Sequence, residues 1–394
     1  MTKEKVLRFG VAGIGAAEYE IQAVLRHPGF RLAALADIEQ EILTSACQRY
    51  GAPGFASVEA LCHSGLIDAV YIGTPTHLHT EHALMGIEAG LHVIVAKPMA
   101  LSLEDAERMT QAADRKGVQL MVGHTQAFEP PVLRMREIIE SGELGSLGMI
   151  NGWYYTDWIY RGRKPEELVT EKGGGVVYRQ GAHHFDIARL LGGGLVGSVR
   201  AMTGRWDVRR RTEGAYAAFL HFESGAAATV VFNGYDHFRS TELGFPISEG
   251  GLEVHHEAYG QARASVAAAS PEGELTLKRA RRRREPGERH QSFYGVTVVS
   301  CERGDIRQSP DGLLIYGDDG SREVPLPPGL TGRDVMLEEL HQAVTTGTPA
   351  PHNGRWGKAT LEVSLAVLQS ARERQEIALS HQVPYRPAAS SSLR

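Results

Sequence analysis

The fold of this chain is decided near its start, by the run Val6-Leu7-Arg8-Phe9-Gly10-Val11-Ala12-Gly13-Ile14-Gly15. Residues 6–12 are apolar apart from Arg8, and the run is short enough to predict a buried strand. Two glycines then permit a tight turn, and an apolar helix is expected through Val24. A strand, a glycine turn and a helix in this order predict a dinucleotide site, because unpaired amides at a helix N-terminus favour a pyrophosphate.

A carboxylate completes this fingerprint. The next predicted strand, residues 32–36, ends at Asp37, which follows Gly15 by 22 residues and can bind both ribose hydroxyls. No arginine follows Asp37, so a 2′-phosphate would meet repulsion, and the sequence favours NAD over NADP. Glu18 departs from the fingerprint, which has a third glycine there. The predicted cofactor-binding residues of this region are Gly13, Ile14, Gly15, Ala16 and Asp37.

The pattern of strands and helices divides the chain in two. Apolar runs at 69–72, 92–96 and 119–122 alternate with helical patterns such as 103–116, which predicts an α/β fold with a doubly wound parallel sheet. Phe128-Glu129-Pro130-Pro131 breaks the alternation. A helix over 132–141 then leads into β-prone runs at 150–156, 215–222, 226–232 and 294–300, followed by helical patterns at 334–344 and 358–371. We therefore predict a Rossmann domain over residues 1–127 and an α+β domain with a mostly antiparallel sheet over residues 128–394.

Composition excludes several classes of protein. The chain is 42% hydrophobic and 23% charged with a net charge of −5, which is typical of a soluble globular protein and gives no reason to expect nucleic acid. The basic run Lys278–Arg284 has no interleaved aromatic residues, so we interpret it as a solvated surface loop. Cys47, Cys62 and Cys301 are scattered, which indicates reduced thiols in a cytoplasmic protein and no metal site. The sequence has neither a signal-like segment nor an apolar run long enough to cross a membrane.

A second informative stretch runs from Lys172 to Asp186. Three glycines lead into an apolar periodic segment, so residues from Arg179 to His183 are expected at a helix start with their side chains facing one way. The segment thus carries a cation and a proton acceptor together. Beside a nicotinamide cofactor, that combination suggests the oxidation of an anionic alcohol.

Several motifs together resemble the glucose-fructose oxidoreductase and inositol dehydrogenase (Gfo/Idh/MocA) family. They are Gly13-Ile14-Gly15, Thr74-Pro75-Thr76-His77-Leu78-His79, Lys97-Pro98, and the glycine triplet leading to His183 and Asp186. Within the family the chain is most similar to the phthalate 4,5-cis-dihydrodiol dehydrogenases, on residues 173–181 and 300–310. The resemblance implies an open sheet in the C-terminal domain that often forms the subunit interface, and hence a homodimer or homotetramer.

The resemblance also implies site residues. Lys97 and His183 are the candidate bases for the substrate hydroxyl, and our hypothesis has His183 accept the proton while Lys97 polarises the oxygen, with the reverse assignment open. Asp186 would orient the histidine ring or stabilise the fold. The cofactor contacts that the resemblance implies are Thr74, Pro75, His79, Lys97 and Pro98.

Two positions depart from the family pattern. Ala96 stands where the family usually has a glutamate before its lysine, and Arg179 stands where it usually has an aspartate four residues before its histidine. A permanent cation in place of an acceptor argues against a polyol and favours a carboxylate. We therefore predict a carboxylated aromatic cis-dihydrodiol as substrate, because its oxidation product tautomerises to a catechol. The predicted substrate-binding residues are Arg179, His184, Tyr155, Trp158 and Arg163.

Three hypotheses follow from the sequence. The first is an NAD-dependent dehydrogenase of carboxylated or chlorinated cyclohexadiene diols, such as phthalate 4,5-cis-dihydrodiol. The second is a sugar or cyclitol dehydrogenase. The third is a non-catalytic dinucleotide-binding regulator, which the missing glutamate before Lys97 keeps open.

Overall fold

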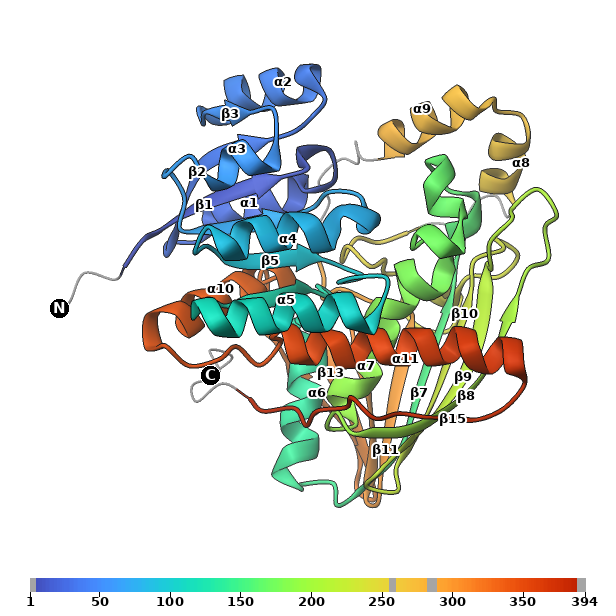
Figure 1. The fold of residues 1–394 in the computed structure, drawn as a ribbon. Helices are drawn as coiled ribbons and strands as arrows, with labels where there is room; N and C mark the ends of the chain where they lie inside the picture. The colour runs from blue at the N-terminus through green and yellow to red at the C-terminus, as the bar shows by residue number, and fades with distance from the viewer. Residues whose placement is uncertain (1–4, 255–259, 282–288, 388–394) are drawn as a thin grey trace.

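The computed structural model describes residues 5–254, 260–281 and 289–387, which build two sheets with their covering helices (Figure 1). The first is a six-stranded parallel sheet in the order β3-β2-β1-β4-β5-β6. Its strands are β1 (Leu7–Ala12), β2 (Phe30–Ala36), β3 (Gly54–Phe55), β4 (Ala69–Ile72), β5 (His92–Ala96) and β6 (Leu120–Gly123). The order reverses between β1 and β4, the kind of switch point where α/β sheets bind ligands, and it confirms the predicted doubly wound sheet.

Helices cover both faces of this sheet, and their ends follow the local sequence. In α5 (Leu103–Lys116), the Ser102 hydroxyl accepts a hydrogen bond from the Asp105 amide at 3.1 Å, and Gly117 ends the helix with φ of +66°. This helix and strands β4 and β5 have the predicted bounds. The other helices of this layer are α1 (Glu18–Arg26), α2 (Gln40–Tyr50), α3 (Val58–Cys62), α4 (His79–Glu88) and α10 (Gly332–Thr346).

The second sheet has nine strands in the order β14-β13-β12-β11-β7-β10-β9-β8-β15. Only the β7–β10 pairing is parallel among its described pairings, so the predicted mostly antiparallel sheet is confirmed. Its strands are β7 (Leu147–Tyr155), β8 (Val196–Gly204), β9 (Ala215–Phe222), β10 (Ala227–Asn233), β11 (Val296–Cys301), β12 (Gly304–Ser309), β13 (Gly312–Gly317), β14 (Gly320–Pro325) and β15 (Ile377–Ala378).

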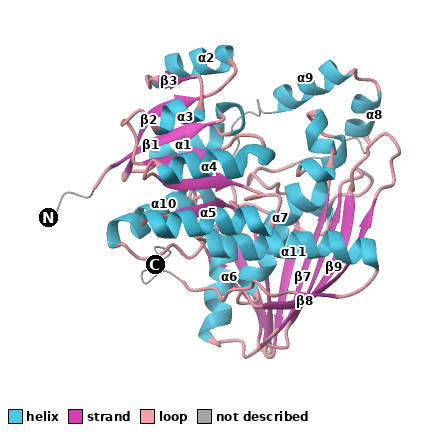
Figure 2. Cartoon of the chain, in the orientation of Figure 1, coloured by secondary structure: helices cyan, strands magenta, loops and turns pink. Residues whose placement is uncertain are grey.

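The two faces of the second sheet differ. Three helices pack on one face, as Figure 2 shows: α6 (Pro130–Ser141), α7 (Ala182–Leu191) and α11 (Gly354–Glu373). Side chains alternate across β7, so Ile150 and Tyr154 lie in the core below these helices, while Met149 and Trp153 point to the other face and stay exposed. Met202, Phe219 and Tyr316 occupy outer positions in register with that row and are also exposed. The sheet therefore exposes several large apolar side chains on the face that these helices leave uncovered.

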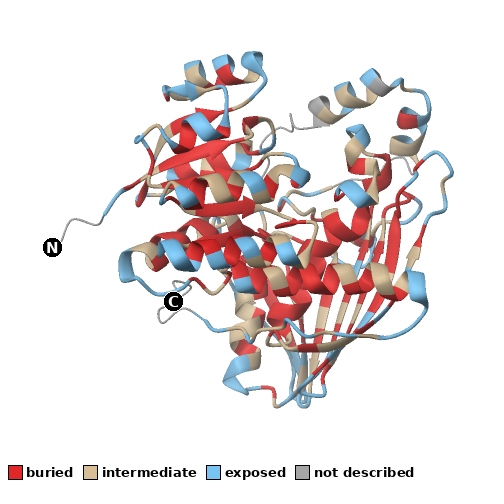
Figure 3. Cartoon of the chain, in the orientation of Figure 1, coloured by how far each residue is buried: buried red, intermediate tan, exposed pale blue. Residues whose placement is uncertain are grey.

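The last third of the chain returns to the first sheet. Met336, Leu337 and Leu340 of α10 belong to the core that packs on β1 and α1. Helix α11 contacts α5 and β6 of the first layer as well as β8 and α7 of the second, and its inner face is buried (Figure 3). Helix α10 therefore packs with the first layer, although its residues lie in the second predicted domain. The domain boundary at residues 127/128 remains a prediction.

The basic run is not the solvated loop that we expected where the structure describes it. Residues 278–281 end helix α9 (Pro271–Arg281), which follows α8 (Gln261–Ala267), and the Lys278 ammonium pairs with the Glu167 carboxylate. A buried counter-charge therefore holds Lys278, while Arg282, Arg283 and Arg284 lie outside the described residues. None of the helices described here is both long and apolar enough to cross a bilayer.

Candidate active site

The carboxyl ends of the parallel strands collect the candidate residues at one edge of the first sheet. Gly13 follows β1, Asp37 follows β2, Thr74 comes shortly after β4 and Lys97 follows β5. His124, which the sequence analysis did not single out, follows β6. Ligands of open α/β sheets bind at this edge, so the fold brings cofactor and catalytic candidates together.

The glycine turn is shaped for a dinucleotide. Gly13 has φ of +81°, and a Cβ there would lie 2.6 Å from the Gly73 carbonyl, so only glycine fits. The Gly15 amide donates to Asp37 Oδ2 at 3.3 Å, which holds the carboxylate beside the turn. Glu18, the departure from the fingerprint, accepts from the Tyr50 hydroxyl at 2.6 Å, which directs its charge toward α2. These residues fit NAD: the turn and the N-terminus of α1 would hold the pyrophosphate, and Asp37 would hold a ribose.

His79 joins the two loops that follow β4 and β5. Its ring nitrogens lie 2.8 Å from the Thr74 carbonyl oxygen and 2.8 Å from the Pro98 carbonyl oxygen, and the side chain is buried. The Lys97–Pro98 peptide between β5 and the following loop is cis. His79 therefore holds the backbone of the loop after β4, which carries the predicted cofactor contacts Thr74 and Pro75. Pro75 itself is exposed.

Lys97 reaches from the first sheet to the second domain. Its ammonium donates to the backbone carbonyl of Arg179. Desolvation of the amine, followed by the positive charge of Arg179, holds the pKa of Lys97 well below its usual value of 10.5. A lowered pKa makes it easier for the lysine to lose its proton, which is what a proton acceptor at this position requires.

The Arg179–His183 segment differs from the expected helix start. Residues Val177–Gly181 form a π-helical turn, and α7 begins only at Ala182. The carbonyl of Arg179 accepts from Lys97, and the carbonyl of Gln180 accepts from the Tyr294 hydroxyl at 2.8 Å. In a regular α-helix these two carbonyls would accept hydrogen bonds from backbone amides of the same helix. Here they bind side-chain donors, which gives a physical reason for the π-helical turn.

His183 lies at the first turn of α7. Its side chain is 8% exposed, its ring lies 5.6 Å from that of Tyr294, and its Nδ1 has no hydrogen-bond partner. Burial, with a smaller contribution from the charge of Lys97, lowers the pKa of His183 well below its usual 6.5. The imidazole is therefore neutral and able to accept a proton.

Arg179 belongs to a cluster of charges around Glu167. Arg179 Nη2 lies 3.1 Å from Glu167 Oε1, Arg163 Nη1 lies 4.0 Å from the same oxygen, and Lys278 pairs with the other oxygen. Burial of Glu167 opposes ionisation, but the charges of Arg179, Arg163 and Lys278 outweigh it and lower the pKa of Glu167 to about 2. Three cations around one carboxylate leave a surplus of positive charge, and Arg179 remains 28% exposed.

Three other predicted substrate residues have packing roles in the structure. Trp158 is fully buried, and the Arg163 guanidinium stacks on it at 3.7 Å from the ring centre. Tyr155 packs edge-on against Phe238. His184 Nδ1 lies 3.1 Å from the Tyr216 hydroxyl, inside the core between α7 and the second sheet. These contacts give the predicted substrate roles of Tyr155, Trp158 and His184 no support.

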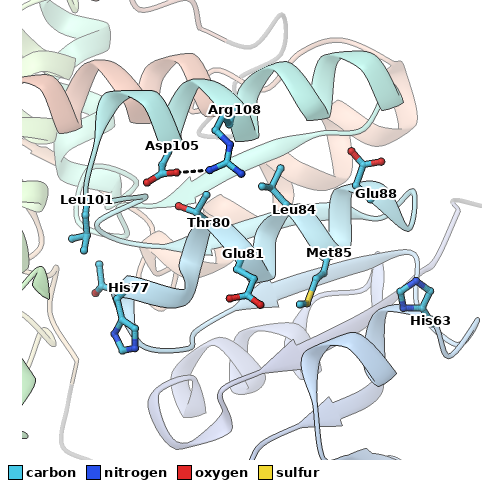
Figure 4. A pocket seen from close by; sticks show the side chains of 11 residues that line it. His63, His77, Thr80, Glu81, Leu84, Met85, Glu88, Leu101, Asp105 and Arg108 are labelled. Carbon is cyan, nitrogen blue, oxygen red and sulfur yellow. Dashed lines mark hydrogen bonds and ion pairs between the residues drawn. The ribbon is translucent and has the colours of Figure 1, made fainter.

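A groove of about 580 Å³ lies between α4 and α5 (Figure 4). Thr76 and Leu101 are among its lining residues, and the Thr76 hydroxyl lies 3.5 Å from Arg179 Nη1. The rest of the groove is lined by outward-facing residues such as Glu81, Met85 and Arg108, so it adjoins the Arg179 end of the site without including Lys97 or His183.

Sequence reasoning missed Glu167 and His124. His124 was within reach, because it comes two residues after the predicted strand 119–122, at the edge that also carries Lys97. Glu167 had no signal, because its role depends on Arg179, Arg163 and Lys278, which only the fold brings around it. Within the described part of the chain, no three His, Cys, Asp or Glu side chains are grouped as metal ligands.

This arrangement is that of a nicotinamide-dependent oxidoreductase, and comparisons with known proteins agree. Residues 7–124 match the model of an oxidoreductase family with an NAD-binding Rossmann fold, and residues 132–261 match the GFO/IDH/MocA C-terminal domain. The chain belongs to the Gfo/Idh/MocA oxidoreductase family, and its cofactor is NAD.

Two relatives match almost the whole chain. The 1-carboxy-3-chloro-3,4-dihydroxycyclohexa-1,5-diene dehydrogenase of Comamonas testosteroni is 34% identical over 380 residues, which are 93% of this chain and 95% of the relative. The crystal structure of a protein assigned as a dehydrogenase, from Bordetella bronchiseptica RB50, is 40% identical with a TM-score of 0.90, covering 95% of this chain and 100% of that one. An inositol 2-dehydrogenase of Corynebacterium glutamicum is 30% identical over 203 residues, which are 50% of this chain and 57% of the relative.

We propose that Asp37 binds the ribose hydroxyls of NAD. Asp37→Ala should raise the Kd for NAD roughly 10-fold to 100-fold, because a hydrogen bond to a charged group contributes about 1.5–3 kcal/mol. Titration calorimetry on the purified protein measures this. Glu39→Ala removes an exposed carboxylate two residues away and is the control. An unchanged Kd in Asp37→Ala would assign the ribose contact to other residues.

Proposed function

We propose that this protein oxidises a carboxylated aromatic cis-dihydrodiol to the corresponding catechol, with NAD as cofactor, in the breakdown of aromatic compounds. The observation that carries the proposal is the position of Arg179. Its backbone carbonyl accepts from Lys97, and its guanidinium lies in a cluster with surplus positive charge. The similarity to a dehydrogenase of a carboxylated, chlorinated diol supports the same substrate class.

The guanidinium of Arg179 is suited to hold a substrate carboxylate. Glu167 occupies Nη2 at 3.1 Å, whereas Nη1 makes only a 3.5 Å contact with the Thr76 hydroxyl. A carboxylate can replace that long contact with a shorter charge-assisted hydrogen bond. Because Lys278 and Arg163 offset the charge of Glu167, the cluster attracts an anion despite the carboxylate at its centre.

The proton of the substrate hydroxyl goes to Lys97 or to His183. Bound NAD supplies the acceptor for the hydride that leaves the same carbon. The pKa values of both groups are lowered, which favours the unprotonated form that accepts a proton. We assign the proton to His183 and the polarisation of the oxygen to Lys97, which already donates a hydrogen bond at this place.

The substrate class is tested by NADH formation with four compounds: phthalate 4,5-cis-dihydrodiol, a chlorinated monocarboxylated diol, benzene cis-diol and myo-inositol. Wild-type protein should oxidise only the carboxylated diols. Arg179→Gln should raise KM for these roughly 10-fold to 100-fold, because it removes a charge-assisted hydrogen bond.

The matched control for this experiment is Arg372→Gln, which neutralises an arginine whose side chain is 73% exposed at the end of α11. It should leave KM unchanged for every compound. Preferential turnover of myo-inositol would instead favour the cyclitol dehydrogenase. NAD binding without turnover of any compound would favour a dinucleotide-binding regulator.

The assignment of the base is tested by comparing Lys97→Met with His183→Asn. Each should lower kcat by about 10²–10⁴-fold if the group takes part in proton transfer. Because only an unprotonated group can accept the proton, the wild-type rate should fall as the pH drops through the lowered pKa of the base. In the variant that lacks the base, this fall in rate at low pH should disappear. The variant that still shows the fall lacks the residue that polarises the oxygen.

We further propose that two copies of the chain associate through the open apolar face of the second sheet. Trp153 and Phe219 are exposed there, Trp153 is flanked in register by Val231 and Val296, and burial of such side chains stabilises a dimer. Trp153→Glu combined with Phe219→Glu should shift the protein toward monomer in sedimentation equilibrium. Val208→Glu, at an exposed loop position, is the control. An unchanged mass would exclude this face as the interface.

A further inference from the structure

Buried polar atoms without partners gather behind the proposed base. Among the described residues, such atoms include His183 Nδ1, His124 Nδ1, Asp186 Oδ2 and His352 Nε2. All four side chains are more than nine-tenths buried. An unpaired buried polar group costs about 1–3 kcal/mol, so a group of them calls for an ordered water or a chemical role.

The topology places these residues next to one another. Ala96 of β5 pairs with Gly123 of β6, so Lys97 and His124 follow paired positions on strands about 4.8 Å apart. His183 and Asp186 are three residues apart on α7 and share one face of that helix. His124 Nδ1 lies 3.5 Å from Asp186 Oδ1, which connects the strand end to the helix.

The hydrogen bonds that hold the Asp186 carboxylate end on one of its two oxygens. Its Oδ1 accepts from Trp356 Nε1 at 2.7 Å and from the Thr360 hydroxyl at 2.6 Å, both on α11. Arg189 Nη1 lies 3.9 Å from the same oxygen. The second oxygen has no donor in the structure, so the carboxylate keeps a free acceptor site beside His124.

His352 connects this group to the surface. The His352 backbone carbonyl accepts a hydrogen bond from the Val122 amide at 3.4 Å. Val122 lies near the end of β6, two residues before His124, so His352 packs against this end of the strand. Its ring lies 5.8 Å from the ring of Trp356. On its other side, His352 Nδ1 lies 2.9 Å from Glu339 Oε2, and the Glu339 side chain is 11% exposed. Glu339 is thus the member of the series that meets solvent.

Proton affinity is higher at His352 than at His124. Burial lowers the pKa of His183 well below 6.5, with the charges of Lys97, His124, Arg333 and Arg179 adding to the effect. Burial also lowers the pKa of His124 to about 4, against the pull of Asp186, with His352, Lys97 and Arg189 as the other charged neighbours. Burial opposes a charge on His352 too, but Glu339 outweighs it and raises the pKa of His352 above 6.5.

We propose that His124 and His352, with Asp186 and intervening water, form a proton relay from the catalytic base to Glu339. The relay rests on the proposed dehydrogenase function. Each turnover breaks a C–H bond, whose electron pair leaves as hydride to NAD, and an O–H bond, whose proton goes to the base as the C=O bond forms. The site is then left with one proton that must leave before the next turnover, and the relay delivers it to solvent.

The direct test is His124→Asn. The asparagine amide can still donate to Asp186 from the position of Nδ1, but it cannot pass a proton on. We expect kcat with the diol substrate to fall about 10-fold to 100-fold, with the Kd for NAD and the melting temperature unchanged. Added imidazole should restore part of the lost kcat. Loss of kcat that imidazole does not restore, or no loss at all, would overturn the relay.

A second variant, Glu339→Gln, acts at the partly exposed end, where a fold defect is less of a concern. It should lower kcat in the same direction, and in cofactor-free protein it should lower the pH at which His352 titrates, followed by ¹⁵N NMR of histidine-labelled protein. An unmoved His352 titration and a wild-type kcat would overturn the outer half of the relay. Failure of wild-type protein to oxidise any diol would instead count against the proposed function, while the NMR titration still tests the His352–Glu339 link.

Discussion

The site depends on the hydrogen bond from the Lys97 ammonium to the Arg179 carbonyl. It is the contact at which the parallel sheet, which carries the cofactor turn, meets the segment that carries the proposed substrate-binding arginine and the proposed base. The donor belongs to a strand end of one layer and the acceptor to a π-helical turn of the other, so neither layer alone makes a reacting centre. The desolvation that lowers the pKa of Lys97 follows from the same docking of the two layers.

Much of the framework could be predicted from the sequence, because it rests on local patterns. The strands 69–72 and 92–96 and the helix 103–116 have apolar periodicity bounded by clear start and stop signals, and the structure has them at the predicted bounds. The chain positions of Lys97 and His183 also follow from motifs. What local patterns could not show is which carbonyls a distant side chain would bind, and so the helix expected at Arg179 became a π-helical turn.

The charge cluster around Glu167 could not be predicted from local patterns either. The basic run was predicted to be a solvated loop because Glu167, which pairs with Lys278, is more than a hundred residues away in sequence. Tyr155 and Trp158 were predicted to bind substrate; in the structure Tyr155 packs against Phe238 and Arg163 stacks on Trp158, and the substrate roles remain predictions. Composition reports which side chains a segment offers, whereas their partners depend on the packing of elements that are far apart along the chain.

The cluster around Glu167 also constrains how this protein could evolve. Loss of Arg179 alone would leave a buried carboxylate with one fewer neighbouring cation, and loss of Glu167 alone would leave three cations close together. A lineage that moves to uncharged substrates must therefore change these positions together or pass through a poorly stable intermediate. Substitutions at residues 163, 167, 179 and 278 are accordingly expected to be inherited as a correlated set among relatives that differ in substrate charge.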